Sequence, residues 1–201
     1  MTALRHTAWL HTQCCDSTQA LAREWVTTLD LPVNGPALRA APGTHTGDDP
    51  HVAALFSTDS QRSGRGREGR TWHDPPGSAA MFSLAVALPR IDADEHLARR
   101  VAEQARDALV AAGAPAPEVR EPNDLYIDGR KVGGVLVDAQ TIEGSLHWVI
   151  AGVGINLTGE PFDADGRSAT SVHHATGVTL EATAVILSLV DRLQPTLGFD
   201  S

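Results

Sequence analysis

Cysteine, basic residues and long apolar runs are all scarce in this 201-residue sequence. Its 2 cysteines, the adjacent Cys14 and Cys15, are too few for a disulfide framework or a thiolate zinc site, so we predict no metal site. Lys and Arg number 16 against 25 Asp and Glu, and a formal net charge of −9 argues against a protein that mainly coats nucleic acid or anionic membranes. Neither a secretion signal nor a membrane span is recognisable, so we expect a cytoplasmic protein without a membrane partner.

What remains is an ordinary globular composition, with 42% hydrophobic and 20% charged residues. The length suits one domain, so we expect residues 1–201 to fold as a single unit. Residues 31–50 are rich in Pro, Gly, Thr and Asp and are predicted to form a long surface loop.

Apolar periodicity predicts both helices and strands. Helices are expected after Ser17 as N-cap, after a capping box of Asp92 and Glu95, and from Glu181 to Pro195. Strands are predicted over 51–57, 80–88, 124–128, 131–138 and 145–155, with antiparallel pairing among the last three. The predicted class is α+β: a mostly antiparallel or mixed sheet with helices packed on a face.

One segment, 59–72, combines glycines with arginines and ends on Trp72. Gly64, Gly66 and Gly69 let the backbone approach a ligand closely, while forked guanidinium groups suit phosphate oxygens. A solvated loop or an RNA-binding segment has a similar composition. Its position between two predicted strands of an acidic protein favours a loop that closes over an anion.

Two further segments place polar groups and glycines at strand ends. Residues 121–136 contain Glu-Pro-Asn-Asp and then Gly-Arg-Lys-Val-Gly-Gly-Val-Leu, and residues 152–156 read Gly-Val-Gly-Ile-Asn. Paired glycines within an apolar strand normally mark a close approach of another group, so a ligand is expected to lie on these strands. The last segment is too short for a dinucleotide fingerprint.

These three segments, in this order, resemble the biotin–protein ligase family. The matching patterns are G-R-G-R-x-G-R-x-W, then P-N-D-L-Y with G-R-K-x-x-G-[IV]-L, then G-[IAV]-G-I-N. Ser17-Thr18 is similar to the family's S-T-N, and Ala169-Thr-Ser171 to its A-T-S-L. The resemblance implies a class II synthetase-like catalytic domain that lacks both an N-terminal helix-turn-helix and a C-terminal β-barrel.

The resemblance also implies an activity and a set of site residues. The implied reaction converts biotin and ATP, accompanied by Mg²⁺ held mainly by phosphates and water, into biotinyl-5'-AMP. A lysine of a biotin carrier domain then takes the acyl group.

Catalysis is assigned to Lys131, Arg67 and Asp124. Biotin contacts are assigned to Ser17, Thr18, Gln61, Gly64, Arg65, Lys131, Gly134, Leu136 and Gly152. Nucleotide contacts are assigned to Arg67, Arg70, Trp72, Asn123, Lys131 and Asn156. The expected partner is a carboxylase carrier domain, a homodimer is compatible, and no specific DNA is expected.

Departures from the family pattern keep two alternatives open. Gln19 replaces asparagine in S-T-N, Arg120 replaces lysine, and Glu121 replaces tryptophan before Pro-Asn-Asp. A carboxylate near a phosphate site is unfavourable unless Arg120 or Arg130 pairs with it. One alternative is a related acyl-adenylate ligase for another acid, such as lipoate or octanoate, or for a small-molecule amine. The other is a non-catalytic module that binds biotin, nucleotide or RNA.

Overall fold

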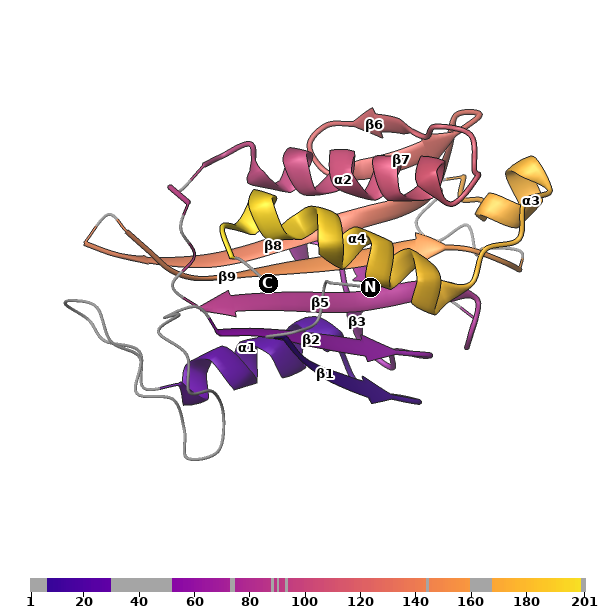
Figure 1. Ribbon diagram of the computed structural model, residues 1–201. Coiled ribbons are helices and arrows are strands. Elements are labelled where there is room, and N and C mark those ends of the chain that lie inside the picture. The colour runs from indigo at the N-terminus through magenta and orange to yellow at the C-terminus, as the bar shows by residue number, and fades with distance from the viewer. Residues whose placement is uncertain are drawn as a thin grey trace.

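A seven-stranded mixed sheet forms the centre of the protein (Figure 1), with strand order β1-β2-β5-β9-β8-β7-β6. The computed structural model describes residues 7–29, 52–72, 75–87, 89, 91–92, 94–143, 145–159 and 168–199. Strands β1 and β2 are parallel, and the other neighbours in the sheet are antiparallel. The predicted α+β class is confirmed, while the loop predicted over 31–50 lies outside the described residues.

The described elements have the following bounds. The sheet contains β1 (Thr7–Thr12), β2 (Val52–Thr58), β5 (Ala79–Ala87), β6 (Glu118–Arg120), β7 (Asp124–Ile127), β8 (Arg130–Ile142) and β9 (Ser145–Asn156). A separate hairpin contains β3 (Gly64–Arg65) and β4 (Thr71–Trp72), joined through a 3-10 turn at Arg67–Gly69. The helices are α1 (Thr18–Thr28), α2 (Leu97–Ala111), α3 (Val172–Thr176) and α4 (Ala182–Leu197).

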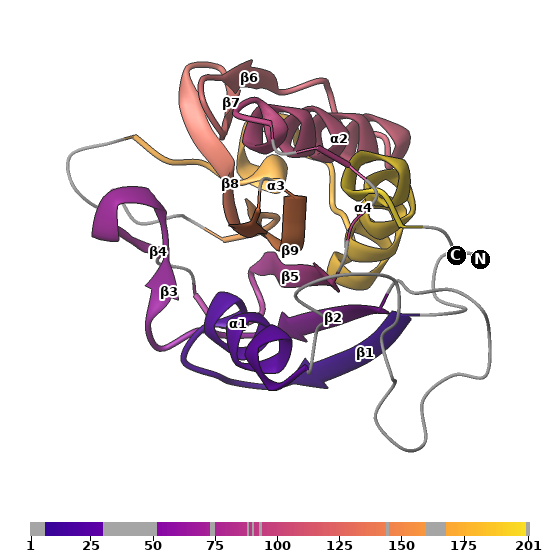
Figure 2. The same cartoon turned by 90° about the vertical axis from the view of Figure 1, so that its left-hand side faces the viewer.

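Helices cover both faces of the sheet, and this division creates room for a site. Helices α2 and α4 pack on one face over the main apolar cluster, which includes Phe82, Leu84 and Leu189. Helix α1 and the β3–β4 hairpin lie on the opposite side (Figure 2). Helix α1 seals only part of that face, through a smaller cluster that includes Val26 and Ile150. The rest of the face is available as the floor of a cavity.

Several predicted boundaries need correction. The capping box of Asp92 and Glu95 is wrong: α2 begins at Leu97, and the Asp94 carboxylate accepts from the His96 backbone N–H at 2.8 Å. Ser17 occupies the N-cap of α1, but its hydroxyl makes no capping bond. Helix α4 passes through Pro195, the predicted stop, and ends where Gly198 adopts a left-handed conformation with φ of 64°.

Strands β1 and β6 and helix α3 were not predicted. Strand β1 is at an edge of the sheet and four of its residues are exposed, so its pattern contains no alternation to detect. None of the helices in the described ranges is long and apolar enough to cross a membrane.

Candidate active site

The uncovered part of the sheet carries a cavity of about 150 Å³ between α1, the β3–β4 hairpin and the ends of β7 and β8. Its floor is formed by residues that pair across β5, β9 and β8 and therefore point to one face. Side chains are absent from the centre of the floor at Gly134, Gly152 and Gly154, and side chains of α1, the hairpin and the β7–β8 strands lie against these glycines. The close approach that the paired glycines indicated is made here by the protein's own side chains, and a ligand lying on the strands stays a prediction.

The cavity gathers all but one of the predicted site residues. Those lining it are Ser17, Thr18, Gln61, Arg65, Arg67, Arg70, Trp72, Asn123, Asp124, Lys131, Gly134, Leu136, Gly152 and Asn156. The exception is Gly64, which lines an adjacent groove between the hairpin, Arg23 of α1 and Asp138 of β8. Gly64 is opposite Trp72 in the hairpin, where a Cβ would approach the Trp72 carbonyl oxygen to 2.8 Å. Its place in the structure is explained by hairpin packing.

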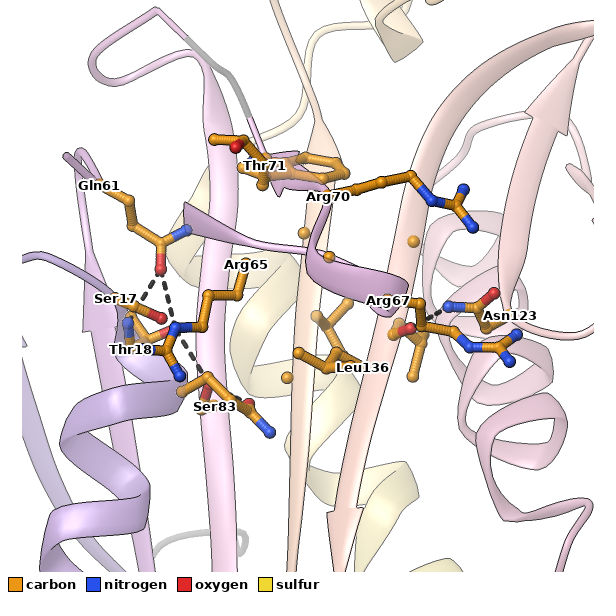
Figure 3. A pocket seen from close by; sticks show the side chains of 18 of the residues that line it. Ser17, Thr18, Gln61, Arg65, Arg67, Arg70, Thr71, Ser83, Asn123 and Leu136 are labelled. Carbon is orange, nitrogen blue, oxygen red and sulfur yellow. Dashed lines mark hydrogen bonds between the residues drawn. The ribbon is translucent and has the colours of Figure 1, made fainter. Parts of the chain in front are cut away.

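One end of the cavity is built from uncharged hydrogen-bonding groups of α1, Gln61 and β5 (Figure 3). The Thr18 backbone N–H donates to Gln61 Oε1 at 2.9 Å, and the Thr18 hydroxyl is 3.0 Å from Ser83 Oγ. The Ser17 hydroxyl is buried and has no hydrogen-bond partner in the described part of the chain. A buried unpaired hydroxyl favours a polar ligand atom beside it.

The other end of the cavity carries charge. Lys131 Nζ donates to Asp124 Oδ1 at 2.7 Å, and these side chains are 24% and 15% exposed. They come together because β7 and β8 form a hairpin, and because Gly134 leaves room: a Cβ there would be 3.2 Å from Asp124 Oδ1. An ammonium group and a carboxylate held this way can counter a phosphate charge and accept a proton, respectively.

Two asparagines hold the backbone around this charged end. Asn123 is buried and its amide donates to the Val135 carbonyl, which fixes the turn that carries Asp124. Asn156 donates to the Thr170 carbonyl at 3.1 Å and ties β9 to the segment before α3. Both amides line the cavity, so the predicted nucleotide contacts are placed within reach but remain predictions.

The arginine-rich hairpin forms the mouth of the cavity. Arg62 pairs with Asp16 at 3.3 Å, and Arg70 pairs with Glu68 at 2.7 Å. Within the described ranges, neither Arg65 nor Arg67 pairs with a carboxylate. In Figure 3 the Arg65 side chain extends toward Thr18 and Ser83, whereas Arg67 lies at the side of Asn123. The hairpin therefore offers cations to both ends of the cavity.

Trp72 lies across the floor of the cavity. Its ring is packed on Gly154, where a Cβ would approach Trp72 Cζ2 to 2.8 Å, and its indole N–H is buried without a described partner. The cavity is smaller than the several hundred Å³ usual for ligand pockets, and the ring occupies part of the available space. Binding of an acid together with a nucleotide would require Trp72 to move.

Glu121 is paired by an arginine other than the two nearest it in sequence. Its carboxylate pairs with Arg99 of α2, and Glu121 does not line the cavity, so the Glu121 charge does not oppose a phosphate there. Arg120 instead binds Glu118 at 2.8 Å, lowering the pKa of that carboxyl through the hydrogen bond, and its guanidinium lies over Tyr126.

Sequence reasoning also missed lining residues. Ser83 and Gly154 were not assigned, although a serine in an otherwise apolar strand and the second glycine of the 152–156 segment were available signals. Gln19 was noticed only as a departure from a pattern. The position of Gln19 against the cavity floor depends on how α1 packs across the sheet, and local sequence patterns do not predict that packing.

Comparison with known proteins gives one family. The model of the "Biotin/lipoate A/B protein ligase family" matches residues 46–156. The "Bifunctional ligase/repressor BirA" of Bacillus subtilis (strain 168) is 31% identical over 137 residues, covering 66% of this chain and 42% of that protein. The "Biotin--[acetyl-CoA-carboxylase] ligase" of Paracoccus denitrificans is 32% identical over 130 residues, covering 64% and 52%. The matches thus span about half the length of these relatives.

Solved structures agree in fold. A biotin protein ligase from Aquifex aeolicus, in complex with biotin and ATP, superposes with a TM-score of 0.69 at 22% identity, covering 94% of this chain and 70% of that one. The biotin acetyl coenzyme A carboxylase synthetase from Helicobacter pylori gives 0.67 at 20% identity, covering 95% and 75%.

Proposed function

The chain belongs to the biotin/lipoate A/B protein ligase family, and on that premise we propose that it is an ATP-dependent biotin–protein ligase. It joins the biotin carboxylate to AMP, giving biotinyl-5'-AMP, and then transfers biotin to a lysine of a biotin carrier domain. One observation carries the proposal: a single cavity has hydroxyl and amide groups of α1, Gln61 and β5 at one end, with the Arg65 side chain beside them (Figure 3), and the Lys131–Asp124 pair at the other. That polarity matches an acid with a neutral ureido head and a carboxylate to be activated.

In the first step a biotin carboxylate oxygen bonds to the α-phosphorus of ATP, and the bond to pyrophosphate breaks. Negative charge grows on the phosphate oxygens, so cations fixed beforehand lower the barrier. Lys131 is proposed to bridge the carboxylate and the α-phosphate, with Arg67 and Arg70 from the hairpin beside it. A Mg²⁺ ion would be held by ATP phosphates and water and would neutralise further charge.

In the second step the amine of the carrier lysine attacks the acyl carbon, and AMP leaves. The attacking nitrogen must lose a proton, and Asp124 is proposed to accept it. Ser17, Thr18 and Gln61 are proposed to bind the ureido head, while Gly134, Leu136 and Gly152 carry the acyl chain. Trp72 would cover adenine after leaving Gly154, with Asn123 and Asn156 near the nucleotide.

The test is acid-dependent exchange of labelled pyrophosphate into ATP, measured separately with biotin, lipoate and octanoate. Exchange with biotin, at rates well above those of the other acids, is the expected result. Exchange with lipoate or octanoate alone would assign the chain to a related acyl-adenylate ligase, the second candidate that Gln19 motivates. If no acid supports exchange but biotin binds in calorimetry, the non-catalytic alternative holds.

A further inference from the structure

The end of the cavity that carries the Ser17, Thr18 and Ser83 hydroxyls is closed by the side chain of Gln19. This residue lies in the first turn of α1 and is 5% exposed. Its amide oxygen accepts from Ser83 Oγ at 2.9 Å, and its amide nitrogen donates to Asp138 Oδ2 at 3.1 Å. Reversing the amide would turn its oxygen toward a carboxylate, so the two contacts together define one orientation.

Gln19 marks the point at which the floor ends. A Cβ on Gly152 would collide with the Gln19 amide oxygen, so the amide rests directly on the backbone of β9. One row further along the sheet, Ile150 is paired with Asp138 and belongs to the apolar cluster under α1. Successive rows on one face are about 6.6 Å apart, two residues along a strand. Gln19 is therefore the boundary between ligand space and the sealed core.

A surface ion pair holds this boundary. Asp138, which receives the Gln19 amide, also pairs with Arg23 at 2.9 Å. Arg23 follows Gln19 by one turn of α1, and its guanidinium is 5.3 Å from the centre of the Trp148 ring. Arg23 and Asp138 line the adjacent groove and not the cavity, so they act on the cavity through Gln19.

We propose that Gln19 is a specificity-determining residue that sets the depth of the acid compartment, and that Asp138 and Arg23 are positioning residues that keep it there. The inference rests on the proposed function and deepens it. The accepted acids have a neutral head that ends at Gln19, and acids with a substituent beyond that point are excluded. Gln19 thus accounts for acid choice, whereas Lys131 accounts for activation.

The test compares biotin with an analogue that carries one methyl group on a ureido nitrogen. For each protein, kcat/KM in pyrophosphate exchange is measured with both acids and expressed as a ratio. Gln19→Ala should lower the preference for biotin by about tenfold, because one methylene-sized group in a fitted pocket is worth at least that much. The gain for the methylated acid should appear in KM, since the wall touches bound and reacting acid alike.

Variants outside the cavity separate positioning from mere folding. Asp138→Ala should lower the preference in the same direction, while Asp138→Asn, which keeps an oxygen acceptor for Gln19, should restore most of it. Glu24→Ala, on the exposed side of α1, is the matched control and should leave the ratio unchanged. If Gln19→Ala does not fold, Gln19→Asn, shorter by one methylene, takes its place.

Two outcomes are distinguishable. Biotin-dependent exchange with an unchanged ratio in folded Gln19→Ala and Asp138→Ala overturns the role of Gln19 alone. Absence of exchange in the unaltered chain overturns the proposed function, and calorimetry with the same two acids then decides the inference. In calorimetry, an affinity preference for biotin over the methylated acid that is smaller in Gln19→Ala than in the unaltered chain supports the inference. The same preference in both proteins, or no binding of either acid, overturns the inference.

Discussion

The Lys131–Asp124 pair brings together the two groups that the proposed reaction needs. One must counter charge at phosphate and the other must accept a proton, and each satisfies the other's charge across 2.7 Å before a ligand arrives. A charge in a partly buried place is costly without such a partner. Replacing Lys131 should therefore slow mainly adenylate formation, and replacing Asp124 should slow mainly transfer to the carrier lysine.

Lys131→Ala is expected to lower biotin-dependent pyrophosphate exchange by about 10²- to 10³-fold, the effect of losing one fixed donor to a developing charge. The fold should persist, because Lys131 lies at a strand end and is partly exposed. Exchange kinetics and a thermal melt of the same preparation check both points. An exchange rate near that of the unaltered chain would show that Lys131 has another role.

Asp124→Asn is expected to affect transfer more than activation. The amide keeps the shape of the side chain but cannot take a proton, so biotin transfer to a carrier domain should fall by about 10²- to 10⁴-fold. Pyrophosphate exchange should fall less, because adenylate formation requires Asp124 only to hold Lys131 in place. Single-turnover transfer from preformed adenylate, measured beside exchange, compares the two. Equal losses in both would assign Asp124 to lysine positioning alone.

The two cysteines differ in surroundings despite being adjacent. Cys14 is exposed, whereas Cys15 is buried, and burial raises the pKa of the Cys15 thiol. The thiolate is the reactive form, so iodoacetamide near neutral pH should modify Cys14 much faster than Cys15. Peptide mass spectrometry over a time course measures both. Equal labelling rates would contradict the burial of Cys15.

At the scale of elements, the central strands and the antiparallel pairing of β7, β8 and β9 could be predicted, and the packing of the helices against them could not. Strands β5 and β9 were predicted to within one residue, because long apolar runs bounded by turns specify them. The family resemblance is confirmed by the match to residues 46–156, since its motifs are local runs of sequence. The contacts of Gln19 and Glu121 could not be predicted, because Asp138 and Arg99 reach them through the packing of α1 and α2.

The hairpin from Arg62 to Trp72 is the element that we expect to change conformation most when a ligand binds. It has only two short strands, and Glu68 and Gly69 have positive φ angles of 57° and 75°. Anions should order it by binding Arg65 and Arg67. Trypsin should therefore cut within 62–72 more slowly when biotin and ATP are present. The control is cleavage at a site elsewhere in the chain, which ligands should not change. Equal rates within the hairpin would argue against closure.

At the scale of the whole molecule, charge is divided unevenly. The chain carries a net charge of −9, yet Arg65, Arg67, Arg70 and Lys131 all line one cavity. Such an arrangement draws an anionic substrate to the site while the rest of the surface repels polyanions. It suits a nucleotide better than a nucleic acid strand.

DNA binding by this 201-residue chain is accordingly expected to be weak and independent of sequence. The hairpin can reach a few phosphates, so affinity at physiological salt should be no tighter than about 10⁻⁴ to 10⁻⁶ M and should fall steeply as salt rises. Fluorescence anisotropy with several unrelated duplexes, across a salt series, measures both properties. Arg65→Ala should weaken binding to all duplexes alike, because phosphate contacts carry no sequence information. A duplex bound 10³-fold or more tighter than the others, roughly the low end of specific recognition, would show that the chain reads base edges and that its charge distribution has been misread.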